Sequence, residues 1–177
     1  MDDRELRLLI SDEEIRHRVD ELAAKISRDY KGNAPVLVGV LKGAFIFLAD
    51  LARRMEEPPE IDFIQLSSYG LRGTERADIQ VSLEPRTDLA GRHVIIVEDI
   101  VDSGETLTFL RQYLSERRPA TLRICSLLAR ERLLDAQPGM IDYLGFPVGE
   151  GWLVGYGLDL SEKFRHLTGL YVVAGTP

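Results

Sequence analysis

The sequence predicts an α/β domain with a mainly parallel central sheet flanked by helices. Val36–Leu41 and Val94–Val97 are unbroken apolar runs, which are typical of strands buried on both faces. Each run leads through a glycine-containing turn into a segment whose apolar residues recur at helical spacing. No repeat, low-complexity run or linker interrupts the 177 residues, so we expect residues 1–177 to form a single domain.

Composition narrows the class of protein. Hydrophobic residues make up 45% of the chain and charged residues 29%, as in ordinary globular proteins. The net charge of −7 argues against a general nucleic-acid binder. We find neither a signal peptide nor an apolar stretch that could span a membrane, so we expect no membrane partner. The one cysteine, Cys125, excludes an internal disulfide, fits a reducing cytoplasm and is interpreted as a buried packing residue.

The N-terminal third begins with a long helix. Ser11–Glu14 is a capping-box pattern, and the apolar residues that follow it fall on one helical face. We expect a helix from about Asp12 to Tyr30, which the Gly-, Asn- and Pro-containing segment 31–35 ends. After the strand at 36–41, Lys42 and Gly43 precede a second helix, expected over 44–54.

The next region contains two extended arms. Segments 61–69 and 78–83 alternate apolar and polar residues, as half-buried strands do. The polar stretch between them contains Gly70 and Gly73, which would serve as hinges if the arms form a lid over a site. The alternative is a surface β-hairpin without a functional role.

The C-terminal part completes the predicted sheet. We expect strands at 121–128 and 141–146, an extended glycine-rich segment at 152–159, a single helical turn in 161–167, and an edge strand of the sheet at 170–173. Ligands of such sheets bind beyond the carboxyl ends of the strands.

The most informative stretch is His93–Thr106. Its apolar strand is expected to end at the adjacent carboxylates Glu98 and Asp99, and small residues then lead into a helix expected from Thr106. A helix N-terminus binds phosphate, whereas neighbouring carboxylates call for sugar hydroxyls or a magnesium ion. Together they indicate a ribose phosphate site, the alternative being a βα turn with a solvated acidic rim.

A second glycine-containing turn follows the strand at 36–41, and this turn carries a lysine. Lys42 lies at the carboxyl end of that strand and beside a helix N-terminus, where it is well placed for a second anion. The alternative is that Lys42 extends along the start of the helix with its ammonium group in solvent.

The run from Val97 to Thr106 resembles the 5-phosphoribosyl-1-pyrophosphate loop of the type I phosphoribosyltransferases, and their hypoxanthine-guanine branch fits best. The resemblance extends in order from Leu41 to Arg165. It implies the fold of that family, with a small hood from the chain ends and a flexible β-arm lid. It also implies transfer of a phosphoribosyl group from 5-phosphoribosyl-1-pyrophosphate to a 6-oxopurine base, with Mg²⁺ as cofactor.

The resemblance assigns roles on the sugar side of the reaction. Glu98 and Asp99 would hold the ribose hydroxyls and metal, and Asp102 would be the catalytic base. The remaining assignments are the 5-phosphate loop (Asp102, Ser103, Gly104, Glu105, Thr106), the pyrophosphate site (Lys42, Gly43, Arg165, with a non-proline cis peptide before Lys42) and the lid pair Ser68 and Tyr69.

The resemblance also assigns a base site. Trp152 would stack on the purine, backbone groups around Leu153 would read its edge, and Asp159 would hold a metal through water. Arg130 stands where the family usually has a lysine that donates to the purine 6-oxo group. Because a planar guanidinium and a compact ammonium are not equivalent, the choice among hypoxanthine, guanine and xanthine stays open.

Other functions on the same fold also stay open. They are a xanthine or pyrimidine phosphoribosyltransferase, and an RNA-binding regulator, which the acidic balance disfavours. The family resemblance further implies a homo-oligomer, either a dimer or a tetramer.

Overall fold

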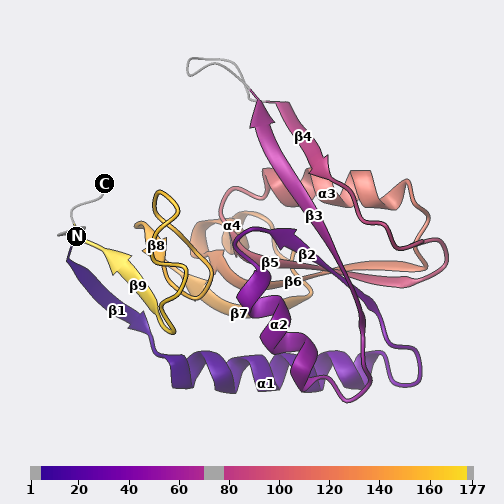
Figure 1. Cartoon of the computed structure of the whole chain (residues 1–177), viewed down its shortest axis with the longest axis horizontal. Helices are drawn as coiled ribbons and strands as arrows, with labels where there is room; N and C mark the ends of the chain where they lie inside the picture. Colours follow the sequence, from indigo (N-terminus) through magenta and orange to yellow (C-terminus); the bar gives the residue numbers. More distant parts are fainter. Residues whose placement is uncertain (1–4, 70–77, 175–177) are drawn as a thin grey trace.

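The computed structural model describes residues 5–69 and 78–174 and has a six-stranded sheet at its centre (Figure 1). The strand order is β4-β3-β2-β5-β6-β7. Neighbouring strands run parallel except at the β3–β4 edge, which confirms the mainly parallel sheet. The strands are β2 (Val36–Leu41), β3 (Glu60–Tyr69), β4 (Asp78–Leu83), β5 (His93–Val101), β6 (Thr121–Arg130) and β7 (Tyr143–Val148).

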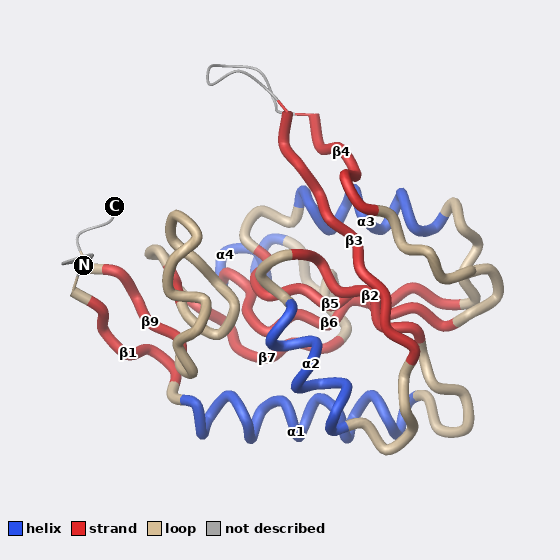
Figure 2. The backbone as a smooth tube through the Cα atoms, in the orientation of Figure 1, coloured by secondary structure: helices blue, strands red, loops and turns tan. Residues whose placement is uncertain are grey.

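Helices cover both faces of this sheet (Figure 2). One face packs against α1 (Asp12–Asp29) and α2 (Phe45–Arg54), and the other packs against α3 (Glu105–Ser115) and the short α4 (Glu131–Ala136). The helix α1 begins with the predicted capping box, in which the Ser11 hydroxyl accepts from the Glu14 N–H and the Glu14 carboxylate accepts from the Ser11 N–H. The short α4 was not predicted. No helix in the described ranges is long and apolar enough to cross a membrane.

Both ends of the described chain build a second, three-stranded antiparallel sheet, the hood, ordered β1-β9-β8. Its strands are β1 (Leu6–Ile10), β8 (Leu153–Val154) and β9 (Leu170–Val173). The hood confirms the small cap implied by the resemblance. The prediction that 170–173 forms an edge strand of the main sheet is wrong, because β9 pairs with β1 and β8 instead.

Two other sequence predictions for the C-terminal part are wrong. Segment 152–159 is extended only at β8, because Gly155, Tyr156 and Gly157 adopt positive φ and turn the chain back. Segment 161–167 contains no helical turn, since Ser161, Glu162 and Phe164 also have positive φ. These residues form a compact loop that closes against the main sheet.

The central strand is longer than predicted. β5 continues past Val97 to Val101, because its ladder with β6 extends as far as the pair Val101 and Ala129. Successive side chains of a strand point to opposite faces of the sheet, so the carboxylates of Glu98 and Asp99 lie on different sides of β5. The expectation that the strand ends at these carboxylates is therefore wrong.

Candidate active site

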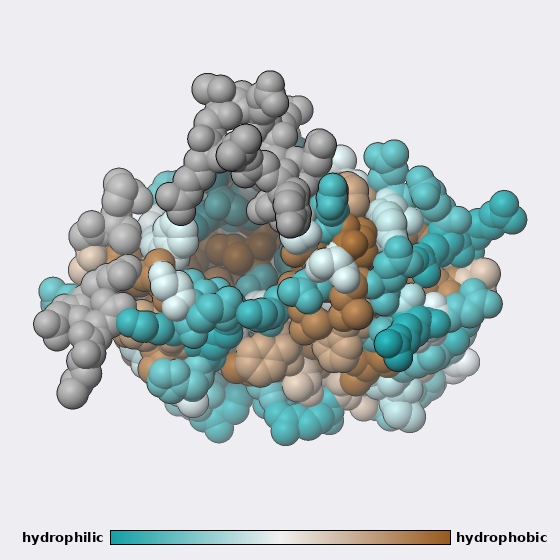
Figure 3. Space-filling model, turned by 45° about the horizontal axis from the view of Figure 1, so that its top comes forward, coloured by the Kyte–Doolittle hydropathy of each residue, from teal (hydrophilic) through white to brown (hydrophobic). Residues whose placement is uncertain are grey.

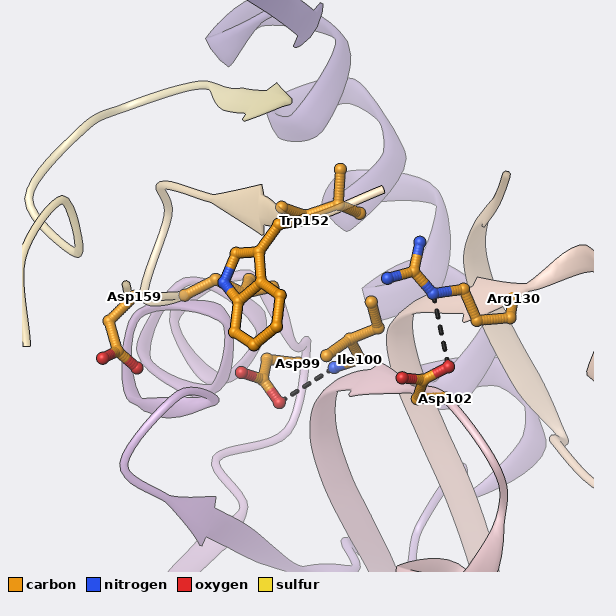
Figure 4. A pocket seen from close by; sticks show the side chains of 8 residues that line it. Asp99, Ile100, Asp102, Arg130, Trp152 and Asp159 are labelled. Atoms are coloured by element: carbon orange, nitrogen blue, oxygen red, sulfur yellow. Dashed lines mark hydrogen bonds and ion pairs between the residues drawn. The ribbon is translucent and has the colours of Figure 1, made fainter. Parts of the chain in front are cut away.

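A pocket of about 220 Å³ opens at the carboxyl ends of β5 and β6, where the hood meets the main sheet. Asp99, Asp102 and Arg130 line it from the main sheet, and Trp152 and Asp159 line it from the hood side (Figure 4). The surface view shows a recess with an apolar floor on the face that carries the β3–β4 arm (Figure 3). Six predicted site residues thus line one cavity, whereas others, such as Lys42, Glu98 and Arg165, are not among its lining residues.

The two adjacent carboxylates of β5 have different surroundings. Asp99 faces the pocket and Gly43, where an added Cβ would overlap the Asp99 carboxylate. Glu98 is buried, and its Oε2 has no hydrogen-bond partner within the described part of the chain. Burial, reinforced by Asp99, raises the pKa of Glu98 well above its usual value. Burial also raises the pKa of Asp99 to about 6, against hydrogen bonds from the backbone.

The predicted 5-phosphate loop joins β5 to α3. α3 begins at Glu105, one residue before the predicted start, with Gly104 as N-cap at φ 80°. A side chain rarely adopts this φ, so the turn favours a glycine for its conformation, whereas the nearest neighbour of an added Cβ would be the flexible end of Met140 at 2.9 Å. Because Gly104 has no side chain to cap the helix, backbone N–H groups of the first turn are available to a phosphate.

Asp102, the predicted base, is held by arginines. Its carboxylate accepts from Arg132 and lies 3.4 Å from Nε of Arg130. Arg132 also donates to Glu150 at 2.7 Å, so it bridges the 5-phosphate loop and the loop before Trp152. Arg132 and Glu150 were missed because no local pattern marks them.

Arg130 supports the loop that precedes Trp152. Its guanidinium donates to the carbonyl oxygens of Gly149 and Gly151, the latter at 2.8 Å, and it is almost fully buried. Trp152 directly follows Gly151 in the sequence and is 52% exposed, whereas Leu153 is buried in β8. The indole projects between Asp159 on one side and Arg130 on the other, with Asp99 beneath it (Figure 4).

The predicted pyrophosphate residues also come together. The Leu41–Lys42 peptide bond is cis, as the resemblance implies. Lys42 Nζ lies 3.2 Å from Glu162, and Arg165 lies 3.2 Å from Glu162 and 2.7 Å from Asp159. Glu162 was missed by the sequence reasoning, although its three-residue spacing from both Asp159 and Arg165 could have suggested a turn linking the three.

The predicted metal ligands are not all brought together. Asp99 and Asp159 both line the pocket, while Glu98 is not among its lining residues. Among the residues that the structure describes, no group of three or more His, Cys, Asp or Glu side chains is arranged to hold a metal. The lid pair Ser68 and Tyr69 ends β3, and the predicted hinges Gly70 and Gly73 lie outside the described residues.

Comparison with known proteins defines the class to which this fold and site belong. Residues 10–158 match the family described as phosphoribosyl transferase domain, and the chain belongs to that family of transferases.

Within the class, the chain is similar to enzymes that act on purine bases. It is 39% identical over 166 residues to the hypoxanthine phosphoribosyltransferase of Salmonella typhimurium, covering 92% of each chain. It is also 39% identical over 173 residues to the hypoxanthine-guanine phosphoribosyltransferase of Aquifex aeolicus, covering 96% of each. The crystal structure of a hypoxanthine-guanine phosphoribosyltransferase from Bacillus anthracis, with a HEPES molecule in its active site, matches with a TM-score of 0.88. The two chains are 38% identical, and the match covers 96% of this chain and 99% of that one.

Proposed function

We propose that the protein transfers the 5-phosphoribosyl group of 5-phosphoribosyl-1-pyrophosphate to a ring nitrogen of hypoxanthine or guanine, giving IMP or GMP and pyrophosphate in purine salvage. One observation carries the proposal: the pocket joins an aromatic face and three carboxylates, and Asp102 on its lining lies three residues before the N-terminus of α3, while Lys42 and Arg165 share Glu162 beside Asp159. These are the groups needed for a base, a ribose, a phosphate and a pyrophosphate.

The sugar phosphate would lie across the carboxyl end of β5. Its 5-phosphate would accept hydrogen bonds from the first turn of α3 and from the hydroxyls of Ser103 and Thr106. Asp99 faces the pocket and would accept from ribose hydroxyls. Glu98 would need a local rearrangement of β5 to reach them, since its side chain is buried away from the pocket.

Cleavage of the anomeric bond leaves positive charge on the ribose, as in glycoside hydrolysis. Lys42 and Arg165 would bind the departing pyrophosphate and offset its charge. Asp99 and Asp159 fit a divalent cation, because both carboxylates line the pocket and the charge of Asp159 disfavours the ionised form of Asp99. Bound Mg²⁺ would supply further neutralisation of the pyrophosphate.

Asp102 would accept the proton from the purine ring nitrogen. In this structure Oδ1 of Asp102 accepts from Arg132 and lies near Arg130, so Oδ2 would be the oxygen that takes the proton. The indole of Trp152 offers a stacking face for the purine, and the backbone of Leu153 lies beside it. Arg130 would donate a hydrogen bond to the exocyclic 6-oxo group through an N–H that its bonds to Gly149 and Gly151 do not use.

A substrate panel tests the proposal. Pyrophosphate release would be measured with the donor, Mg²⁺ and, in turn, hypoxanthine, guanine, xanthine and uracil. We expect turnover with hypoxanthine, guanine or both. Turnover confined to xanthine would contradict the choice of hypoxanthine or guanine, and turnover confined to uracil would contradict the purine assignment altogether. The variant Arg130→Lys, which restores the residue usual in the family, would show whether Arg130 sets the preference among the three purines.

We further propose that the enzyme works in the cytoplasm as a dimer or tetramer. The reducing compartment is supported by the single cysteine, Cys125, which is buried. The oligomer is supported by the family resemblance, and sedimentation velocity with the purified protein would test it.

A further inference from the structure

The two cations of the proposed pyrophosphate site share one carboxylate. Oε1 of Glu162 lies 3.2 Å from Nζ of Lys42, and Oε2 of Glu162 lies 3.2 Å from a guanidinium nitrogen of Arg165. The carboxylate therefore spans the two side chains that the reaction needs for pyrophosphate.

The backbone conformation of the loop places the side chain of Glu162 next to these two cations. Its φ of 62° places it in the left-handed region, and its N–H donates to the Asp159 carboxylate at 2.7 Å. Arg165 is fixed in turn by Asp159 and by the carbonyl oxygen of Gly157. The Glu162 side chain is exposed, so its carboxylate is charged at neutral pH like that of an ordinary surface glutamate.

This contact differs from the ion pairs that form within a single helix. Pairs such as Arg16 with Asp12 join neighbours on one helix, where geometry alone brings opposite charges together. Lys42 and Glu162 are 120 residues apart and meet only because the loop of 159–165 closes against the turn after β2. An anion from a distant segment thus occupies the place where a bound anion would lie.

We propose that Glu162 is a built-in anion of the pyrophosphate site, which holds Lys42 and Arg165 in the empty site and competes with pyrophosphate for them. The inference rests on the proposed function, because it assumes that pyrophosphate binds there. Glu162 would weaken pyrophosphate binding and thereby favour release of that product. Because the side chains of Glu162 and Lys42 are 66% and 56% exposed, solvent screens the charge of Glu162 and the effect should be modest.

Calorimetric titration with inorganic pyrophosphate and Mg²⁺ tests the inference. The variant Glu162→Gln keeps the size and the backbone N–H of the residue but removes its charge. We expect it to bind pyrophosphate about three- to tenfold more tightly than the wild type, because solvent screens the ion pairs of the exposed Glu162. The matched control is Glu21→Gln, which removes an equal charge from a surface carboxylate of α1 that pairs with Arg18, and we expect a change of less than about twofold.

Unchanged or weaker pyrophosphate binding by Glu162→Gln would overturn the inference. A double-mutant cycle adds a second measurement, because the gain from Glu162→Gln should shrink by at least about half when Lys42 is already alanine. If Glu162→Gln unfolds, the variant Glu162→Ala in the same cycle gives the decision. Failure of the folded wild type to bind pyrophosphate at all would contradict the proposed function instead, so the two outcomes are distinguishable.

Discussion

Asp99 has an acid–base equilibrium that folding shifts. Burial raises its pKa to about 6 from the usual value of 3.8, and the charge of Asp159 adds to the shift. The folded state therefore favours the protonated form of Asp99. As pH rises from about 4 to about 6, its contribution to the free energy of unfolding becomes less favourable, and the full cost remains at higher pH.

The variant Asp99→Asn removes this cost. We expect it to raise the urea midpoint relative to the wild type at pH 8, because the variant has no charge to bury. At pH 4.0 most of that advantage should be gone, since the wild-type carboxyl is then protonated. Asp135→Asn, at an exposed position of α4, is the control. An Asp99→Asn advantage of equal size at both pH values would show that burial of charge is not the cause.

Asp102 is predicted to act on the chemical step. In Asp102→Asn we expect kcat to fall by about two to four orders of magnitude, the usual contribution of a positioned general base. The dissociation constant of the sugar donor should change far less, because the phosphate is bound by backbone groups of α3. Steady-state kinetics and calorimetry measure the two quantities. Unchanged turnover would remove Asp102 from the role of base.

At the scale of elements, the site depends on a close contact between two turns. The turn after β2 and the turn after β8 meet at Gly43 and Gly157, where an added Cβ at Gly157 would overlap the carbonyl oxygen of Gly43. Gly157 also has φ 103°, which side chains rarely adopt. The turn that carries Lys42 and the turn that follows β8 are therefore held in a fixed relation by backbone contact.

A series of glycine substitutions separates the strain of a positive φ from the steric overlap of an added Cβ. Gly149→Ala is expected to be nearly neutral, since no heavy atom lies within 4 Å of the added Cβ. Gly139→Ala should lower stability by about 1 kcal/mol through its φ of 80° alone. Gly157→Ala combines strain with overlap and should lower stability most, with weaker binding of both pyrophosphate and purine nucleotide. Thermal unfolding and calorimetry give these values, and a Gly157→Ala protein with wild-type affinities would show that the contact does not organise the site.

The elements that sequence reasoning predicted well carry local signals. The apolar runs of β2 and β5 and the capping box of α1 depend on residues that are near neighbours in the chain. The hood strands β1 and β9 depend on pairing between the two ends of the chain, with Leu6 opposite Val173. Such long-range pairing leaves little trace in a short run of sequence, which is why β1 was missed and β9 was assigned to the wrong sheet.

The distinction between local signals and long-range contacts also holds for the site. The residues of the family motif were predicted by resemblance, and six of them line one pocket: Asp99, Asp102, Arg130, Trp152, Leu153 and Asp159. Their internal partners were not predicted, because Arg132 reaches Asp102 over 30 residues and Glu162 reaches Lys42 over 120. The divergence of Glu98 and Asp99 was missed because β5 was expected to end before them. Backbone pairing with β6, which extends the strand, is again a long-range effect.

At the scale of the whole molecule, the hood and the main sheet share a hydrophobic core. Ile10, Leu153 and Leu170 of the hood belong to the same buried cluster as Leu37 and Val97 of the main sheet. A continuous core couples the two sheets energetically. We therefore propose that the chain folds as a single cooperative domain, although the hood is a separate sheet.

Urea unfolding tests this cooperativity. The sole tryptophan, Trp152, reports on the junction between hood and pocket, while far-ultraviolet circular dichroism reports on the helices and strands of the whole chain. We expect both signals to give one transition with the same midpoint, as two-state unfolding requires. A fluorescence transition at clearly lower urea would indicate that the hood unfolds independently.

The central claim is that a pyrophosphorylated ribose 5-phosphate binds where β5 leads into α3. Calorimetric titration of the wild-type protein with 5-phosphoribosyl-1-pyrophosphate in the presence of Mg²⁺ tests it most directly. We expect saturable binding at one site per chain, which GMP or IMP abolishes by competition. A folded protein that takes up neither the sugar donor nor a purine nucleotide under these conditions would contradict the claim.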